Sequence, residues 1–320
     1  STKIVHGGVR YLRQGRVSLV KKALRERATL LHNAPHLVRK LDFIIPAYSN
    51  WEKFFYASGL KVYDLLASGD EFPESQTVSR DDAIRSLPTL ATDKLRGGVR
   101  YWDGQFDDAR LAINLAATAI DQGATLVNYV AVTGLCKLGD GKVCGVRCVD
   151  RESDHTWEVL GRVVINATGP FTDQVLAMDR PDKKLIAPSQ GVHLVVDRSI
   201  LPISAAMMLP KTDDGRVLFA IPWRGVVIVG TTDTPVQEAT LEPRPQDDEV
   251  NFILESLNRY LDQDVSSEHV RSIYAGIRPL VGGAGGGTSG ISRDHSLWAD
   301  PVSKLVTIAG GKWTTYREMA

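Results

Sequence analysis

Two glycine pairs in this sequence are followed by residues able to bind or transfer charge. Residues 305–320, "LVTIAGGKWTTYREMA", end an apolar run at Gly310-Gly311 and continue with Lys312. Glycines allow close approach of a ligand to the backbone, and a helix that starts after them presents free N–H groups. With the charge of Lys312, this junction suits an anion, a phosphate or an electron-rich ring edge. The alternative is a strand-to-helix turn whose glycines serve geometry only.

The second pair lies in the opening stretch "STKIVHGGVRY". Arg10 offers a planar fork of donors that suits phosphate or carboxylate. His6 has a side chain that exchanges a proton near neutral pH. The alternative here is a packed loop with a surface arginine.

Further candidates lie in the second half of the chain. Arg278 stands in the apolar stretch "YAGIRPLV", and a buried arginine needs an anionic partner, either a protein carboxylate or a phosphorylated substrate. Arg293 lies in "SRDHS". His193, in "SQGVHLVV", has a setting more typical of a packed strand histidine than of a catalyst.

Composition limits the classes of function. The chain has 320 residues, 43% of them hydrophobic and 24% charged, with a formal net charge of +0, which predicts two soluble domains and no general attraction to nucleic acid. No apolar run reaches the roughly 20 residues of a membrane-spanning helix, and no signal segment is expected at Ser1. The spacing of Cys136, Cys144 and Cys148 predicts neither a metal site nor disulfides.

Several elements must hold these residues. Apolar spacing predicts a helix over 16–34 with the charges at 21, 22 and 25–27 on its solvated side. Stretch 40–48 predicts a strand ending at Pro46. Stretch 51–67, "WEKFFYASGLKVYDLLA", is aromatic and apolar, and fits either a core helix or a membrane-surface patch.

An α/β alternation begins at residue 108. It predicts a helix over 108–124, a hairpin around "GDGK" and a strand over 157–169, which together fit a layered α/β domain. From about 185 to 295 strands and hairpins dominate, with one amphipathic helix over 246–262. The stretch "GGAGGGTSG" at 282–290 reads as a mobile loop or an artificial linker.

These stretches together resemble FAD-dependent glycerol-3-phosphate dehydrogenases of the mitochondrial type and their bacterial relatives. The resemblance covers essentially the whole chain. The segments that carry it, in order, are "STKIVHGGVRYL", "YWDGQFDDARLAINLAATA", "VVINATGPFTDQV", "GVHLVV", "GRVLFAIPW", "GTTDTP", "AGIRPLV", "SRDH" and "TIAGGKWTTYREMA".

The resemblance implies an α/β (α+β) fold. It has a glutathione-reductase-like FAD-binding domain, here 1–35, 101–180 and 303–320, and an antiparallel-sheet substrate domain, here 36–100 and 181–302, as in the amino-acid oxidase group. The family's G-x-G-x-x-G unit and C-terminal helical domain are expected to lie outside this chain.

The implied reaction oxidises sn-glycerol 3-phosphate to dihydroxyacetone phosphate. A hydride passes from C2 to flavin N5, and the electrons continue to a quinone. Arg278 is expected beside the reacting hydroxyl, where a cation favours the developing alkoxide, and His6 and His193 are the candidate bases. The implied substrate residues are Arg10, Tyr11, Thr232, Arg278, Arg293 and Lys312. The implied FAD contacts are Thr2, Lys3, Gly7, Val130, Thr168, Gly169, Gly311, Trp313 and Thr314, with no metal.

The resemblance also implies a peripheral membrane protein, on the mitochondrial inner membrane or the bacterial cytoplasmic membrane, with the stretch at 51–66 as a candidate membrane face. A homodimer is one option for its assembly. Two other interpretations remain open: an amino-acid or amine oxidase on the same architecture, and a truncated scaffold that holds no flavin.

Overall fold

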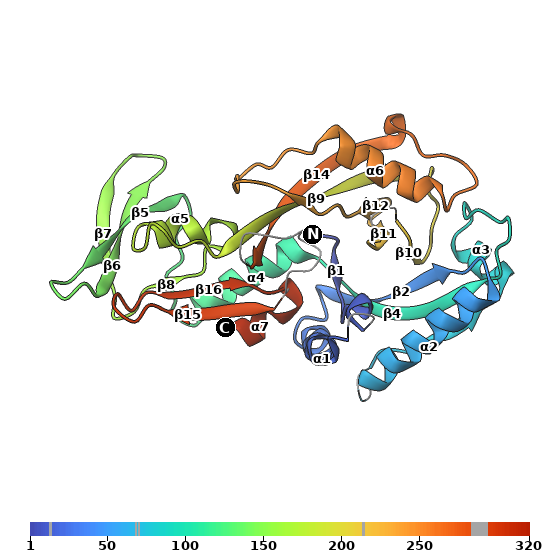
Figure 1. Ribbon diagram of the computed structural model, residues 1–320, viewed down its shortest axis with the longest axis horizontal. Coiled ribbons are helices and arrows are strands. Elements are labelled where there is room, and N and C mark those ends of the chain that lie inside the picture. The colour runs from blue at the N-terminus through green and yellow to red at the C-terminus, as the bar shows by residue number, and fades with distance from the viewer. Residues whose placement is uncertain (13–14, 68, 70, 213–214, 283–293) are drawn as a thin grey trace.

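The computed structural model describes residues 1–12, 15–67, 69, 71–212, 215–282 and 294–320. Its elements form one large sheet in the middle, a small three-stranded sheet at one end and the helices α2 (Asn50–Leu66) and α3 (Arg80–Ser86) at the other (Figure 1). No helix within these described ranges has the length and apolar character needed to cross a bilayer.

The large sheet brings together segments from both ends of the chain. Among the described residues it has ten strands, and every pairing is antiparallel except that of β2 with β10. Its main path runs β1 (Ile4–Val5), β4 (Gly98–Phe106), β2 (Val38–Pro46), β10 (Ala206–Leu209), β11 (Leu218–Trp223), β12 (Val226–Gly230), β9 (Ile186–Asp197) and β13 (Thr234–Pro235). Two further strands, β14 (Val270–Val281) and β3 (Gln76–Val78), pair with β9 and β4.

Two small sheets divide a segment that the sequence predicts as one strand. The predicted strand over 157–169 breaks into β7 (Thr156–Leu160) and β8 (Ile165–Asn166). The first pairs with β6 (Val143–Asp150), which continues to β5 (Val130–Lys137), whereas β8 pairs with β16 (Val306–Gly310), next to β15 (His295–Ala299). The single-strand prediction is therefore wrong, because one apolar run serves two sheets.

The helices follow the predicted apolar spacing, with one correction. The main helices besides α2 and α3 are α1 (Val17–Asn33), α4 (Asp108–Asp121), α5 (Thr172–Ala177), α6 (Asp247–Asn258) and α7 (Tyr316–Met319); the short 3-10 turns are η1 (Val9–Tyr11), η2 (Gly169–Phe171), η3 (Ser267–His269) and η5 (Trp313–Thr315). Glu26 and Arg27 on α1 were expected in solvent but are buried, because Arg27 pairs with Asp103 at 2.7 Å and Glu26 pairs with Arg317 at 3.2 Å.

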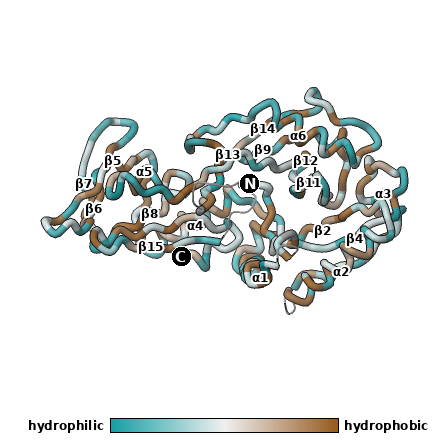
Figure 2. Tube along the Cα trace, in the orientation of Figure 1, coloured by the Kyte–Doolittle hydropathy of each residue, from teal (hydrophilic) through white to brown (hydrophobic). Residues whose placement is uncertain are grey.

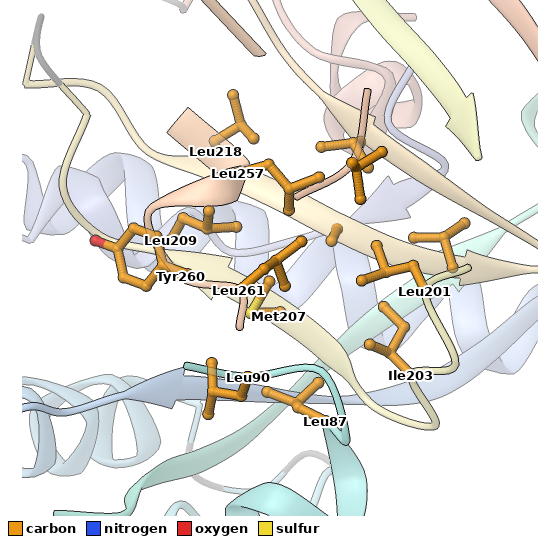
Figure 3. Close-up of a cluster of buried hydrophobic side chains, with 14 of the residues drawn as sticks. Leu87, Leu90, Leu201, Ile203, Met207, Leu209, Leu218, Leu257, Tyr260 and Leu261 are labelled. Carbon is orange, nitrogen blue, oxygen red and sulfur yellow. The ribbon is translucent and has the colours of Figure 1, made fainter. Parts of the chain in front are cut away.

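The largest apolar cluster fixes α6 against the sheet. Leu257, on α6, packs among side chains of β10 and β11, including Met207 and Leu218 (Figure 3). Truncation of such a buried leucine to alanine costs about 2–5 kcal/mol of stability. The cluster therefore holds α6 in a fixed place relative to β9, β11 and β12.

Helix α2 has a different character. It buries Leu60 and Tyr63 but exposes Trp51, Phe54 and Leu65 to solvent, so apolar residues lie on its outer side as well (Figure 2). The sequence predicted this apolar segment and left its role open.

The predicted domain limits do not coincide with the sheets. Strand β4 crosses the limit at residue 101 and pairs along its length with β2, from Val38 opposite Phe106 to Pro46 opposite Gly98. The division into an FAD-binding and a substrate-binding domain stays a prediction.

Candidate functional site

A cavity of about 450 Å³ lies where the N-terminal segment, β14 and the Gly-Gly-Lys segment meet. Its volume falls in the range of small-molecule sites, about 300–1,000 Å³. Its lining consists of Ser1, Thr2, Ile4, His6, Gly8, Val9, Tyr11, Phe43, Tyr101, Asp103, Met208, Arg216, Val217, Phe219, Thr231, Thr232, Asp233, Ile277, Arg278, Pro279, Leu280, Gly311, Lys312, Trp313 and Thr314.

Arg278 reaches the cavity from β14. Its Nη1 donates to the Thr232 carbonyl at 3.0 Å and lies 3.4 Å from Asp233 Oδ1, and its Nη2 donates to Thr231 Oγ1 at 2.9 Å. The guanidinium passes over Gly191, where an added Cβ would lie 2.2 Å from Nη2. Asp233 is thus the anionic partner that a half-buried arginine needs.

Lys312 and Tyr11 meet on another wall of the cavity. The Lys312 Nζ lies 4.3 Å from the centroid of the Tyr11 ring, a cation–π distance. Gly8 allows this approach, because its φ is +79° and an added Cβ would lie 2.5 Å from Tyr11 Cδ2. The two glycine pairs of the sequence therefore border one cavity.

The Gly310-Gly311 pair has the backbone geometry that its sequence suggests. Both residues have positive φ, +77° and +81°. An added Cβ on Gly311 would lie 2.4 Å from Met319 Sδ. The helix expected directly after Lys312 begins only at Tyr316, after the 3-10 turn η5, because the chain turns first around Trp313. A full helix N-terminus at Lys312 is therefore not part of this site.

The two predicted bases occupy different places. His6 lines the cavity. His193 lies behind the lining, where its Nε2 is 2.9 Å from Thr2 Oγ1 and its ring stacks on Tyr274 at 5.0 Å. Burial lowers the pKa of His193 well below its usual range, and the charge of nearby Arg278 acts in the same direction. His193 is therefore neutral at neutral pH.

The structure brings most of the predicted substrate and cofactor residues together. The predicted residues that line the cavity are Thr2, His6, Tyr11, Thr232, Arg278, Gly311, Lys312, Trp313 and Thr314. Arg10 belongs to η1, but its side chain lies outside the described part of the chain, as does the whole of Arg293.

The remaining predicted cofactor residues are not part of the cavity lining. Lys3 pairs with Asp108, and Gly7 packs so closely that an added Cβ would lie 2.4 Å from Tyr63 Oη. Val130 begins β5 in a separate sheet, and the hydroxyl of Thr168, next to Gly169, donates to Asn166 Oδ1 at 2.7 Å. Their roles as FAD contacts stay predictions.

Two acidic residues of the lining had no predicted role. Asp233 lies in "GTTDTP" and Asp103 in "YWDGQFDDAR", so both were visible in the sequence without a sign of their partners. Asp103 accepts from Arg27 at 2.7 Å and from Tyr63 Oη at 3.0 Å. Burial raises the pKa of Asp103, against the opposing charge of Arg27.

Comparison with known proteins agrees with this architecture. Residues 1–317 match the family model described as FAD dependent oxidoreductase. The chain belongs to this family. Human mitochondrial glycerol-3-phosphate dehydrogenase is 43% identical over 336 residues, which cover 100% of this chain and 46% of that protein. The Saccharomyces cerevisiae mitochondrial enzyme is 38% identical over 362 residues, covering 100% of this chain and 56% of that protein.

Solved structures show the same relationship. The glycerol-3-phosphate dehydrogenase from Bacillus halodurans, complexed with FAD, superimposes with a TM-score of 0.77 at 31% identity, covering 100% of this chain and 54% of that one. Glycine oxidase from Bacillus cereus, with a TM-score of 0.67 and 19% identity over 93% of this chain and 76% of that one, shares the fold. The predicted fold class is confirmed. The chain spans about half the length of the curated relatives it matches.

The cavity residues fit the flavin of the family's cofactor, FAD. Gly8 and Gly311 border the cavity with positive φ and no side chain, so a ligand can approach the backbone at both positions, and apolar residues such as Phe43 and Met208 contribute to the lining. A few polar groups in an otherwise apolar pocket are typical of cofactor sites. The ammonium of Lys312 provides a positive charge on the same lining.

Proposed function

We propose that this chain forms the catalytic part of an FAD-dependent glycerol-3-phosphate dehydrogenase, which oxidises sn-glycerol 3-phosphate to dihydroxyacetone phosphate. The observation that carries the proposal is that Arg278 and Lys312, 34 positions apart in the sequence, line one cavity. Two cations suit a substrate that carries a phosphate and develops alkoxide character at C2. The names of the relatives support the same substrate.

Each residue contributes a distinct physical effect. Bound FAD supplies an acceptor for the hydride of C2. Arg278 stabilises negative charge on the substrate oxygen and stays protonated, because an arginine side chain keeps its proton in proteins. Lys312 binds the phosphate as a point charge. His6, on the cavity wall, takes the hydroxyl proton, and neutral His193 supports Thr2 from behind.

The electron acceptor in this proposal is a quinone at a membrane surface. Its support is α2, where Trp51, Phe54 and Leu65 are 71%, 64% and 71% exposed. Large exposed apolar patches mark interaction surfaces, and Trp, Phe and Leu are the residues that insert at a lipid interface. The attachment is peripheral, on the mitochondrial inner membrane or the bacterial cytoplasmic membrane.

The test is anaerobic reduction of the full-length, flavin-containing protein. Mixing with glycerol 3-phosphate should bleach the visible flavin absorbance, whereas glycerol, glycine and L-proline should not. Bleaching by an amino acid instead would establish an amino-acid oxidase. A colourless protein that takes up no added FAD would contradict the proposal altogether.

A further inference from the structure

Glu249 lies outside the cavity lining and outside every role assigned above. It belongs to the first turn of α6 and is only 4% exposed. A buried carboxylate is costly unless hydrogen bonds compensate for the lost water. The hydrogen-bond partners of Glu249 therefore indicate its structural role.

Four donors converge on this carboxylate. Its Oε1 accepts from Thr232 Oγ1 at 2.9 Å and from Thr234 Oγ1 at 2.6 Å. Its Oε2 accepts from Gln190 Nε2 at 2.7 Å and from the Gln246 backbone N–H at 3.1 Å. Helix capping explains only one of these four contacts, the one with the Gln246 backbone N–H. The three side-chain donors come from the β9 strand and from the segment after β12.

Two of these four donors to Glu249, Thr232 and Gln190, also contact Arg278 through their backbone carbonyls. The side chain of Thr232 donates to Glu249, while its carbonyl accepts from Arg278 Nη1 at 3.0 Å. The side chain of Gln190 donates to Glu249, while its carbonyl lies 3.4 Å from the same Nη1. Glu249 thus fixes two of the acceptors that orient the guanidinium.

A further bond ties these segments to each other. Thr232 Oγ1 accepts from the Val192 backbone N–H at 2.9 Å, which joins β9 to the segment after β12. Helix α6 is itself anchored, because Ile253 and Leu257 on it are fully buried in the largest apolar cluster. The carboxylate therefore belongs to a rigid helix and contacts Thr232 and Gln190, which lie next to Arg278.

We propose that Glu249 is a positioning residue, which sets the place of Arg278 in the cavity through Thr232 and Gln190. This inference rests on the proposed function, in which Arg278 stabilises charge on the substrate oxygen. A misplacement of about 1 Å at such a group can cost on the order of a hundredfold in rate. The loss should fall on kcat, since Arg278 acts on the charge that develops during reaction.

The test compares Glu249→Gln with Gln246→Ala in the full-length enzyme. In Glu249→Gln the side-chain amide offers one acceptor oxygen, whereas the carboxylate offers two to the same donors. We therefore expect kcat to fall about tenfold to a hundredfold. Gln246→Ala keeps the backbone N–H that Glu249 accepts from and removes a side chain at the start of the same helix. It should lower thermal stability, as the loss of a side chain at a helix start does, with little effect on kcat.

A double-mutant cycle with Arg278→Lys separates positioning from general destabilisation. If Glu249 acts through Arg278, Glu249→Gln should add little further loss of kcat once Arg278 is replaced. Additive losses, or a kcat in Glu249→Gln equal to that of Gln246→Ala, would overturn the proposal.

A second readout does not depend on the substrate. Phenylglyoxal labelling of Arg278, whose side chain is 23% exposed, can be followed by mass spectrometry of its peptide. Glu249→Gln should change the labelling rate severalfold and Gln246→Ala should not; equal rates would overturn the inference. A wild-type enzyme that ignores glycerol 3-phosphate, yet shows this labelling difference, would contradict the proposed function and leave the positioning role intact.

Discussion

Gly191→Ala should misplace Arg278 without adding or removing any charged group. An alanine Cβ at this position would lie 2.2 Å from Arg278 Nη2 and 2.6 Å from its Cζ, where ordinary contacts begin at 3.4 Å. The guanidinium must therefore move by more than 1 Å. Its bond of 2.9 Å to Thr231 Oγ1 does not survive such a shift.

The size of the effect follows from that displacement. A loss of about a hundredfold in kcat/KM for glycerol 3-phosphate is expected, which corresponds to about 2.7 kcal/mol of transition-state stabilisation. The backbone itself tolerates alanine, because Gly191 is not among the residues with positive φ. Overpacking should cost about 1–3 kcal/mol of stability, so the variant still folds.

The strand partner provides a matched control. Gly276 pairs with Gly191 in the β9–β14 ladder, and an added Cβ there meets no atom within 4 Å. Steady-state kinetics with an artificial electron acceptor should show Gly276→Ala close to wild type and Gly191→Ala strongly impaired. Equal kcat/KM values for the two variants would refute the assignment of Arg278 to the reaction.

Three further predictions concern other parts of the molecule. Lys312→Met should weaken binding of glycerol 3-phosphate about tenfold to a hundredfold, as expected for a lost charge-assisted hydrogen bond, and should shift the flavin potential; unchanged values in titration and potentiometry would contradict its role. Hydrogen bonds from Arg180, at 2.9 Å to each oxygen, hold the pKa of Asp300 below its usual value, so Asp300 stabilises the fold above about pH 4 and this contribution is lost as pH falls further. Asp300→Asn should therefore lower the melting temperature at pH 7, with a gap to wild type that closes in acid; a gap independent of pH would disprove this. Replacing Trp51 and Phe54 by Ser should reduce sedimentation with anionic lipid vesicles, whereas Leu241→Ser, at an 87% exposed residue outside α2, should not; equal sedimentation would exclude α2 as the membrane face.

Local pattern was enough to predict the main helices and the hairpin. The helix over 16–34 appears as α1 because its stop signals, Asn33 and Pro35, act within a few residues. The "GDGK" turn joins β5 to β6 for the same reason. The split of 157–169 into β7 and β8 depends on two different partner strands, which the local pattern does not identify, although Gly161 stands at the break.

The site shows the same limit. Glycine pairs next to Lys312 and His6 marked the two walls of the cavity in advance. The partners of Arg278 could not be read from the sequence, since Asp233 lies 45 positions away and its contact depends on the register of β9 with β14. Arg27 was misread as a solvated charge because its partner, Asp103, is 76 positions away. Local spacing therefore cannot predict the exposure of a charged side chain that is buried by an ion pair with a residue far away in the sequence.

The most direct measurement is a crystal structure of the full-length, FAD-containing protein with sn-glycerol 3-phosphate bound. The account predicts the substrate in the cavity between Arg278 and Lys312, with its phosphate on Lys312 and its C2 oxygen near Arg278. A phosphate bound at another surface, with Arg278 engaged only by Asp233 and Thr231, would contradict it.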